Sequence, residues 1–219
     1  MHMRSLLLAL AIAGCSASVP VAEPPPERAD TAPAPQPTTR TASPFPVGAN
    51  EAAFRTVRSQ RFQLSLPLPD RAGWSLEKEE GSSFLVMQHA STASTLIVRR
   101  WREQAPMNRA RCEEAARLIR DLPAREGQLA SEYLDVPPGF DTRVDVGAED
   151  GPPGPQGWLL AFGASGRRCF AFVYTTTATG PTAEQVVADR LAVIQTMVLA
   201  RVVIHHDTDI ELPRRSIER

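Results

Sequence analysis

The sequence has no excess of charge of either sign, with 24 Lys and Arg residues against 25 Asp and Glu residues among 219. A protein that binds the phosphate backbone of nucleic acids normally carries a basic excess, so we predict no nucleic-acid partner. Long hydrophobic runs are also missing from the N-terminal region. The apolar run at residues 6–12 is far shorter than the ~20 residues that a membrane-spanning helix needs.

Motifs that signal catalysis are missing as well. The chain has no G-x-S-x-G nucleophile elbow and no G-x-x-x-x-G-K-S/T phosphate loop. Residues 163–166 hold a serine at the wrong spacing for the elbow, and we interpret them as a hairpin turn. Glu77, Glu79 and Glu80 indicate a solvated acidic turn rather than the separated carboxylate pair of a glycosidase. We therefore predict no catalytic residue and no cofactor.

The histidines do not predict a metal site. His205 and His206 are adjacent, so on a strand they would point to opposite faces and could not easily share one ion. Asp207 and Asp209 could join one of them, but we interpret this polar segment as a solvated tail. His89 stands at the end of a predicted strand with no Cys or His near it in sequence, and we place it at the rim of the domain.

The first residues have the layout of a secretory signal. Arg4 supplies a positive charge, residues 6–12 are apolar, and small residues precede Cys15. The sequence Ile12-Ala13-Gly14-Cys15 resembles the bacterial lipobox. This resemblance implies a signal peptide at residues 1–14, diacylglycerol on the Cys15 sulfur, and acylation of the new N-terminus after cleavage. The alternative is an ordinary cleaved signal with an incidental cysteine.

The lipobox resemblance also implies a location and a first partner. Two or more acyl chains hold a protein stably on a bilayer, so the partner is the membrane itself, through acylated Cys15. Ser16 follows the cysteine, where an Asp favours retention at the inner membrane of enteric-type bacteria. We therefore expect a lipid-anchored protein of the cell envelope, at the outer membrane and facing the periplasm or the exterior.

Proline, Ala, Thr and Ser dominate the segment that follows the signal. Residues 15–50 contain few apolar side chains large enough for a core, so we predict a disordered tether that begins at the lipidated cysteine. The tether is either a functional spacer or a neutral linker. We predict a single α+β domain at residues 51–206 and a polar tail at residues 207–219.

Strand-like segments dominate the predicted domain. Phe62, Leu64 and Leu66 alternate on one face, and Pro67 and Pro69 are expected to stop that strand. Alternating or continuous apolar runs predict further strands at residues 83–88, 94–101, 157–162 and 169–176, and Val144 and Val146 indicate another. Residues 90–93 are predicted to form a hairpin, and residues 151–155 form a Pro/Gly loop.

Two helices are predicted among these strands. Asn108 is expected to cap the first, which runs to Leu122 before Pro123. Thr182 and Gln185 have the spacing of a capping box at the start of the second helix. An apolar stripe at helical spacing follows it. Near Arg201 the helix either continues or gives way to β-branched residues 202–204, which would add an edge strand.

Strands, a helix, strands and a helix in this order predict a mainly antiparallel sheet packed against two principal helices, an α+β fold. The expected core is Phe62, Leu64, Trp74, Leu96, Val98, Trp158, Phe162, Phe170, Phe172, Leu191 and Ile194. Residues 62–67, Gly73-Trp74 and residues 194–197 make the domain resemble the PsbP/Mog1-like α+β family. The family contains many exported bacterial lipoproteins, and the resemblance implies a binding or accessory module rather than an enzyme.

Cys112 and Cys169 remain once Cys15 is assigned to the lipid. Both lie on faces that we assign to the core, and an exported chain favours a disulfide between them. Two buried free thiols are the alternative. Their separation in sequence argues against a redox-catalytic pair.

Basic residues concentrate in one part of the chain. Arg99, Arg100 and Arg102 flank Trp101, with further arginines on the following helix. Arginine beside an exposed aromatic ring suits the binding of a carboxylate, phosphate or glycan. If Trp101 is exposed, these four residues are a candidate binding patch; if it is buried, the arginines line a solvated surface.

Three functions remain open at this point. The first is a non-enzymatic envelope lipoprotein whose domain binds another envelope protein or a cell-wall component. The second is an envelope hydrolase, which requires a pocket with perturbed titratable groups. The third is a lipoprotein that binds a small ligand between the sheet and a helix.

Overall fold

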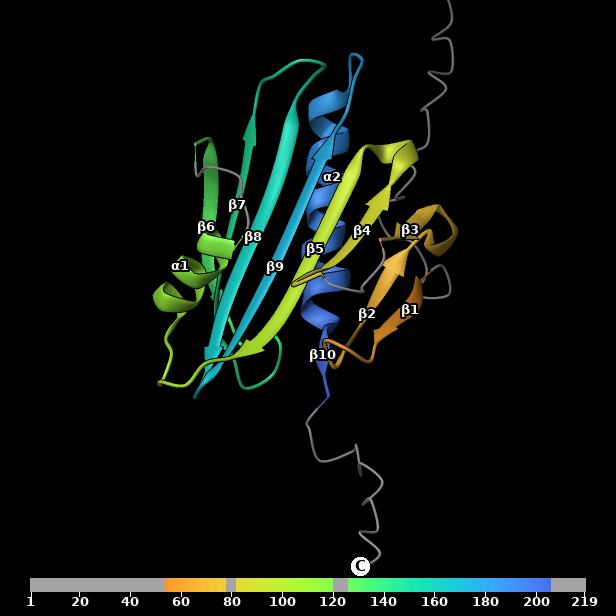
Figure 1. The fold of residues 1–219 in the computed structure, drawn as a ribbon. Helices are drawn as coiled ribbons and strands as arrows, with labels where there is room; N and C mark the ends of the chain where they lie inside the picture. The colour runs from red at the N-terminus through yellow and green to blue at the C-terminus, as the bar shows by residue number, and fades with distance from the viewer. Residues whose placement is uncertain (1–53, 78–81, 120–125, 206–219) are drawn as a thin grey trace, which may run out of the picture. The chain divides into compact units, whose positions relative to one another are not determined.

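The computed structural model describes residues 54–77, 82–119 and 126–205. The predicted signal peptide, Cys15, the tether and the 207–219 tail lie outside the described residues. The described part is an α+β fold made mostly of antiparallel strands, with helices packed on a sheet (Figure 1).

The elements follow one another in an order close to the predicted one. They are β1 (Phe54–Ser59), β2 (Leu64–Pro69), β3 (Trp74–Leu76), β4 (Leu85–His89), β5 (Ser94–Arg102), α1 (Arg109–Ile119), β6 (Gln128–Leu134), β7 (Asp141–Glu149), β8 (Gln156–Ser165), β9 (Arg168–Thr177), α2 (Ala183–Val193) and β10 (Val203–Ile204). A π-helical turn at Ile194–Val198 and a 3-10 turn at Leu199–Arg201 continue the α2 helix.

Seven strands form the main sheet in the order β3-β4-β5-β9-β8-β7-β6. The central strands β8 and β9 are buried at most positions, because both faces of the sheet are covered. The α2 side packs on residues such as Leu159, Phe170 and Phe172, and the α1 side carries Trp158 and Phe162. The predicted core residues are all buried, and the structure divides them between these two faces. Figure 1 shows α1 and α2 against opposite faces of the sheet.

A second sheet has the order β1-β2-β10, so of the two alternatives after α2 the structure shows the edge strand. The expectation that Pro67 and Pro69 stop the preceding strand is wrong, because β2 continues to Pro69. β10 pairs only with Leu64 and Ser65, so both prolines lie where that side of β2 has no strand partner. A missing N–H is tolerated at such a position.

The two predicted helix starts have different outcomes. The Asn108 Oδ1 accepts a hydrogen bond from the Arg111 backbone N–H at 2.9 Å, which confirms the first cap. Thr182 occupies the N-cap position of α2, but its side chain makes no cap hydrogen bond. The Gln185 amide instead donates to Asp189 along the helix at 2.7 Å, so the capping box is wrong.

The hairpin between β8 and β9 is tighter than predicted. Gly163 belongs to β8, which runs to Ser165, and the turn consists of Gly166 and Arg167. Gly166 has φ +61°, a left-handed conformation that glycine adopts without a side-chain clash. Three strands, β1, β3 and β6, were not predicted. β3 has only three residues, β6 is almost entirely exposed, and half of the residues of β1 are exposed, so none of them shows a clear apolar alternation.

Candidate functional site

A disulfide holds α1 on the sheet. Cys112 on α1 and Cys169 on β9 are bonded with an S–S distance of 2.04 Å, and both side chains are fully buried. The pairing predicted from sequence is therefore confirmed. The bridge fixes the position of α1 over β8 and β9, and α1 forms one wall of the concave site described next.

The α1 cleft lies between α1 and strands β6, β7 and β8. Its volume is about 270 Å³, and its lining residues are Asn108, Arg109, Ala110, Glu113, Tyr133, Asp141, Arg143 and Phe162. The Arg109 guanidinium lies 4.2 Å from the centre of the Tyr133 ring and 3.0 Å from an Asp141 carboxylate oxygen. Tyr133 itself is 66% exposed. The cleft therefore presents an aromatic ring, already held in place by an arginine, to the surroundings.

Ion pairs balance the charges inside the α1 cleft. The Arg143 Nη2 lies 3.2 Å from Glu113 and 2.9 Å from Asp145. Asp145 is buried, and its second oxygen accepts a hydrogen bond from the Ser131 hydroxyl at 2.7 Å. Since each of these arginines already has a carboxylate partner, the cleft offers stacking and shape more than a concentrated positive charge.

The β6 strand forms the open rim of this cleft and one edge of the main sheet. Six of its seven residues are exposed, and Leu129 is 73% exposed. The large apolar side chains exposed in the described residues are Leu76, Leu129, Tyr133 and Val203, and all of them belong to edge strands. Two of the four lie on β6, so the apolar exposure concentrates at this edge.

The structure divides the four residues of the sequence-predicted patch between the two faces of β5. Arg99 and Trp101 point to the α1 side, where the Arg99 guanidinium lies 4.8 Å from the Trp101 ring and 5.3 Å from the Phe84 ring. Burial lowers the pKa of Arg99 from its ordinary value, and the carboxylate of Glu103 opposes this shift. Trp101 is half-buried, and its indole N–H donates to Glu103 at 2.8 Å.

Arg100 and Arg102 lie on the other side of the strand. Arg100 donates to the side-chain oxygen of Gln63 and to the backbone carbonyl of His205, so it links β5 to the small sheet. Arg102 is exposed at the end of β5. Alternation along a strand explains why neighbours in sequence do not meet on one surface here.

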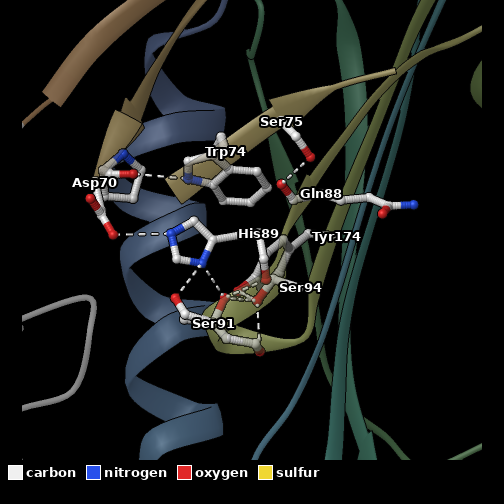
Figure 2. A network of polar contacts seen from close by, with 10 residues as sticks. Asp70, Trp74, Ser75, Gln88, His89, Ser91, Ser94 and Tyr174 are labelled. Atoms are coloured by element: carbon white, nitrogen blue, oxygen red, sulfur yellow. Dashed lines mark hydrogen bonds and ion pairs between the residues drawn. The ribbon is translucent and has the colours of Figure 1, made fainter. Parts of the chain in front are cut away.

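His89 lies at the centre of a buried polar network, so its assignment to the rim of the domain is wrong. Its Nε2 is 3.1 Å from Asp70, and its Nδ1 is 3.2 Å from the Ser91 hydroxyl and 2.9 Å from the Thr92 hydroxyl (Figure 2). The Thr92 hydroxyl continues the network to Ser94 at 2.7 Å. We call these residues, with Tyr174, Thr176 and Arg190, the His89 network.

A short turn between β2 and β3 builds the wall against which the His89 ring lies. Asp70 has φ +44°, and the Gly73 N–H donates to the Asp70 carbonyl at 2.9 Å. The Trp74 indole N–H donates to the Pro69 carbonyl at 2.9 Å, which sets the Trp74 ring beside the imidazole (Figure 2). A Cβ at Gly73 would overlap the His89 ring, so the turn requires glycine at this position.

The far end of the network ties α2 to the sheet. The Tyr174 hydroxyl is 3.0 Å from the Ser94 hydroxyl, and burial raises the pKa of Tyr174 above its ordinary value. The Arg190 Nη1 lies within 3.0 Å of the Thr92 carbonyl, the Thr176 hydroxyl and the Thr177 carbonyl. Burial lowers the pKa of Arg190, and the nearby Tyr174 opposes this shift. The hydroxyls and the Arg190 Nη1 therefore have partners inside the fold, as most buried polar groups do.

One part of the network resembles the carboxylate–imidazole–hydroxyl arrangement of a general base and its nucleophile. A carboxylate at Nε2 favours the tautomer with hydrogen on that nitrogen, which leaves Nδ1 free to accept from a hydroxyl. Ser91 is exposed, so Asp70, His89 and Ser91 form an acid–base–hydroxyl series that ends at the surface. Thr92 shares the same Nδ1, and none of these residues lines the α1 cleft.

No group of three or more His, Cys, Asp or Glu side chains in the described residues could hold a metal ion. His205 lies 3.1 Å from the Ser65 hydroxyl, and the remaining residues of the histidine–aspartate segment fall outside the described ranges. Nor does any helix within residues 54–77, 82–119 and 126–205 have the length and apolar character to cross a membrane.

Comparison with known proteins gives little further information. No protein-family model matches the chain, and no curated protein matches its sequence. A solved crystal structure from Bacteroides thetaiotaomicron resembles it over 71% of this chain, with 9% identity and a TM-score of 0.44. The matched region covers 50% of that protein, so this chain spans about half of its length.

Proposed function

We propose that this protein is a lipid-anchored component of the bacterial cell envelope whose domain is a non-enzymatic binding or accessory module. The observation that carries the proposal is the contrast between the His89 network and the β6 edge. The His89 side chain is fully buried among partners, whereas the apolar residues of β6 are exposed beside the α1 cleft. Aromatic and arginine side chains of the Tyr133–Arg109 kind are enriched at protein interfaces.

The lipobox-like Ile12-Ala13-Gly14-Cys15 supports the anchor, and the disulfide agrees with an oxidising compartment outside the cytoplasm. Metabolic labelling with an alkyne fatty acid tests this part directly. The native chain should incorporate the label and fractionate with membranes, and Cys15→Ala should do neither. Labelling that persists in Cys15→Ala would contradict the assignment.

We also propose that the domain is of the PsbP/Mog1-like type. Ser16 after the lipidated cysteine supports an anchor in the outer membrane. The support for the domain type is the sequence of elements from β2 through the Trp74 turn to the closing α2 helix. The family is functionally mixed, and the resemblance favours a binding or accessory module over an enzyme by analogy.

In-cell cross-linking tests the module. Native protein and Cys15→Ala are cross-linked in the native host and purified, and the adducts are compared. The proposal predicts an adduct with a specific envelope component that depends on the anchor. Identical adducts in both forms, or none in either, would contradict a membrane-dependent accessory role.

The Asp70–His89–Ser91 series favours an envelope hydrolase as the second candidate. A fluorophosphonate probe, whose phosphorus bonds to the oxygen of an activated serine as fluoride leaves, distinguishes the two functions. The hydrolase requires labelling of the native chain that disappears in Ser91→Ala. The binding module predicts no labelling of either form.

A further inference from the structure

The free edge of β6 differs from the other strand edges of the described residues. β6 has seven residues, whereas the opposite edge of the main sheet, β3, has three and β10 has two. The remaining edge strand, β1, carries exposed Arg55 and Arg58, charges of the kind that discourage strand addition. β6 is therefore the longest edge, and it has no basic residue.

The charged residues of the β6 segment itself are all acidic. Residues 126–135 contain Glu126, Glu132 and Asp135 and no Lys or Arg. Asp135 accepts a hydrogen bond from the Gly139 N–H at 2.9 Å, so its carboxylate belongs to the following turn. Glu132 is exposed, and the Gln195 amide donates to it.

Strand alternation assigns a different chemistry to each side of this edge. Tyr133 pairs with Arg143 of β7 and points to the α1 cleft, whereas Glu132 pairs with buried Val144 and points to the α2 side. The register shift between Gln128 and Ala130 leaves residues 130–134 as the regular part of the strand. An added strand would therefore place one side chain beside Tyr133 and the adjacent one beside Glu132.

We propose that the β6 edge, at residues 130–134, binds an extended segment of another protein in which basic and apolar residues alternate. The backbone of the segment would extend the main sheet, a recurring mode of peptide recognition. Its basic residue would lie opposite Glu132, and its apolar neighbour would contact Tyr133 at the rim of the α1 cleft. This proposal rests on the proposed binding function and names the kind of partner that it takes.

The charge pattern favours such a segment over a second copy of the chain. Two β6 edges brought together would oppose acidic strands that carry no basic residue to compensate them. Like charges directly opposite on neighbouring strands are destabilising, whereas opposite charges stabilise the pair.

The test measures binding of a synthetic peptide with alternating Lys and Val residues to the full lipidated chain in detergent, by fluorescence anisotropy. A peptide with Glu in place of Lys is the ligand control. The native chain should prefer the Lys peptide, and Glu132→Lys should weaken that binding by about tenfold and favour the Glu peptide. Glu184→Lys makes the same change of charge on exposed α2 and should leave the preference unchanged.

Hydrogen exchange identifies where the peptide binds. The bound Lys peptide should slow amide exchange in β6 more than in β1. Equal affinity of Glu132→Lys and the native chain for the Lys peptide, or protection elsewhere than β6, would overturn the proposal. Concentration-dependent dimers that Glu132→Lys abolishes would assign the edge to a second copy instead. Neither result would bear on the accessory function, because anchor-dependent cross-linking tests that function separately.

Discussion

The two ends of the main sheet use polar and apolar side chains in opposite ways. At the β3–β4 end, His89 and the hydroxyls of Thr92, Ser94 and Thr176 are buried, and exposed Asp70 contacts His89 from the β2–β3 turn. Arg190 of α2 donates to the same buried group. At the β6 end, Leu129 and Tyr133 are exposed, while the buried Asp145 is paired with Arg143. The residues that resemble a catalytic site therefore connect elements of the fold, whereas apolar residues of a kind that a core would normally contain are exposed at the β6 edge.

The largest expected effect concerns the disulfide that fixes the β6 end. The double variant Cys112→Ala, Cys169→Ala should lose about 4 kcal/mol of unfolding free energy, because the bridge closes a loop across a separation of 57 residues. Chemical denaturation measures this loss, with Cys15→Ala, which retains the bridge, as the control. Amide exchange should increase in α1 more than in β4. A loss below about 1 kcal/mol would show that packing alone holds α1.

The next effect concerns the opposite end. Gly73→Ala should lose about 2 kcal/mol, because its methyl group would push the His89 ring from its partners. Gly151→Ala is the matched control, since a Cβ at Gly151 meets nothing within 4 Å, and it should change stability by less than about 0.5 kcal/mol. Equal stability of the two variants in thermal unfolding would contradict a tightly packed network.

A smaller effect on stability is expected from removing the Tyr174 hydroxyl, which belongs to the His89 network. Tyr174→Phe should lose about 1 kcal/mol at neutral pH, because the Ser94 hydroxyl loses a partner. Burial raises the folded-state pKa of Tyr174, so the unfolded chain releases this proton first, above about pH 10. Stability should therefore fall as pH rises beyond that point. Urea denaturation at pH 8 and pH 10.5 should show a weaker fall in Tyr174→Phe, and the same fall in both forms would exclude this residue as its source.

The smallest effect on stability is expected at the open edge. Tyr133→Ala should change the unfolding free energy by less than about 1 kcal/mol, since its ring is exposed and loses only the contact with Arg109. The same variant should reduce binding of the Lys–Val peptide. A large loss of stability would mean that Tyr133 is part of the core of this end, and not a binding residue.

The sequence was sufficient to predict the buried strands and the disulfide. Residues 157–162 and 169–174 contain no charged or strongly polar side chain, and their length and content lead directly to β8 and β9. The pairing of Cys112 with Cys169 followed from a helix face and a strand face that both belonged to the core. These predictions succeed because a position buried on both faces of the sheet or beneath a helix accepts mainly apolar side chains, which the sequence shows directly.

The candidate site was harder to predict. β6 has the sequence of an exposed segment, and nothing in Gln128–Leu134 itself shows that β7 lies beside it. His89 was misplaced because Asp70 is 19 residues away in sequence and reaches it through a turn with a left-handed aspartate. The Gly73-Trp74 pair was the available signal, since a glycine before a large buried ring often marks a close approach of two elements.

The most direct test of this contrast is site-specific photo-cross-linking in the native host. A photoreactive phenylalanine analogue is placed at Tyr133 in one strain and at Ser91, the exposed end of the His89 network, in another. The account predicts a covalent adduct with an envelope protein from position 133 and none from position 91. An adduct from position 91 alone would place the functional surface at the His89 network and contradict the account.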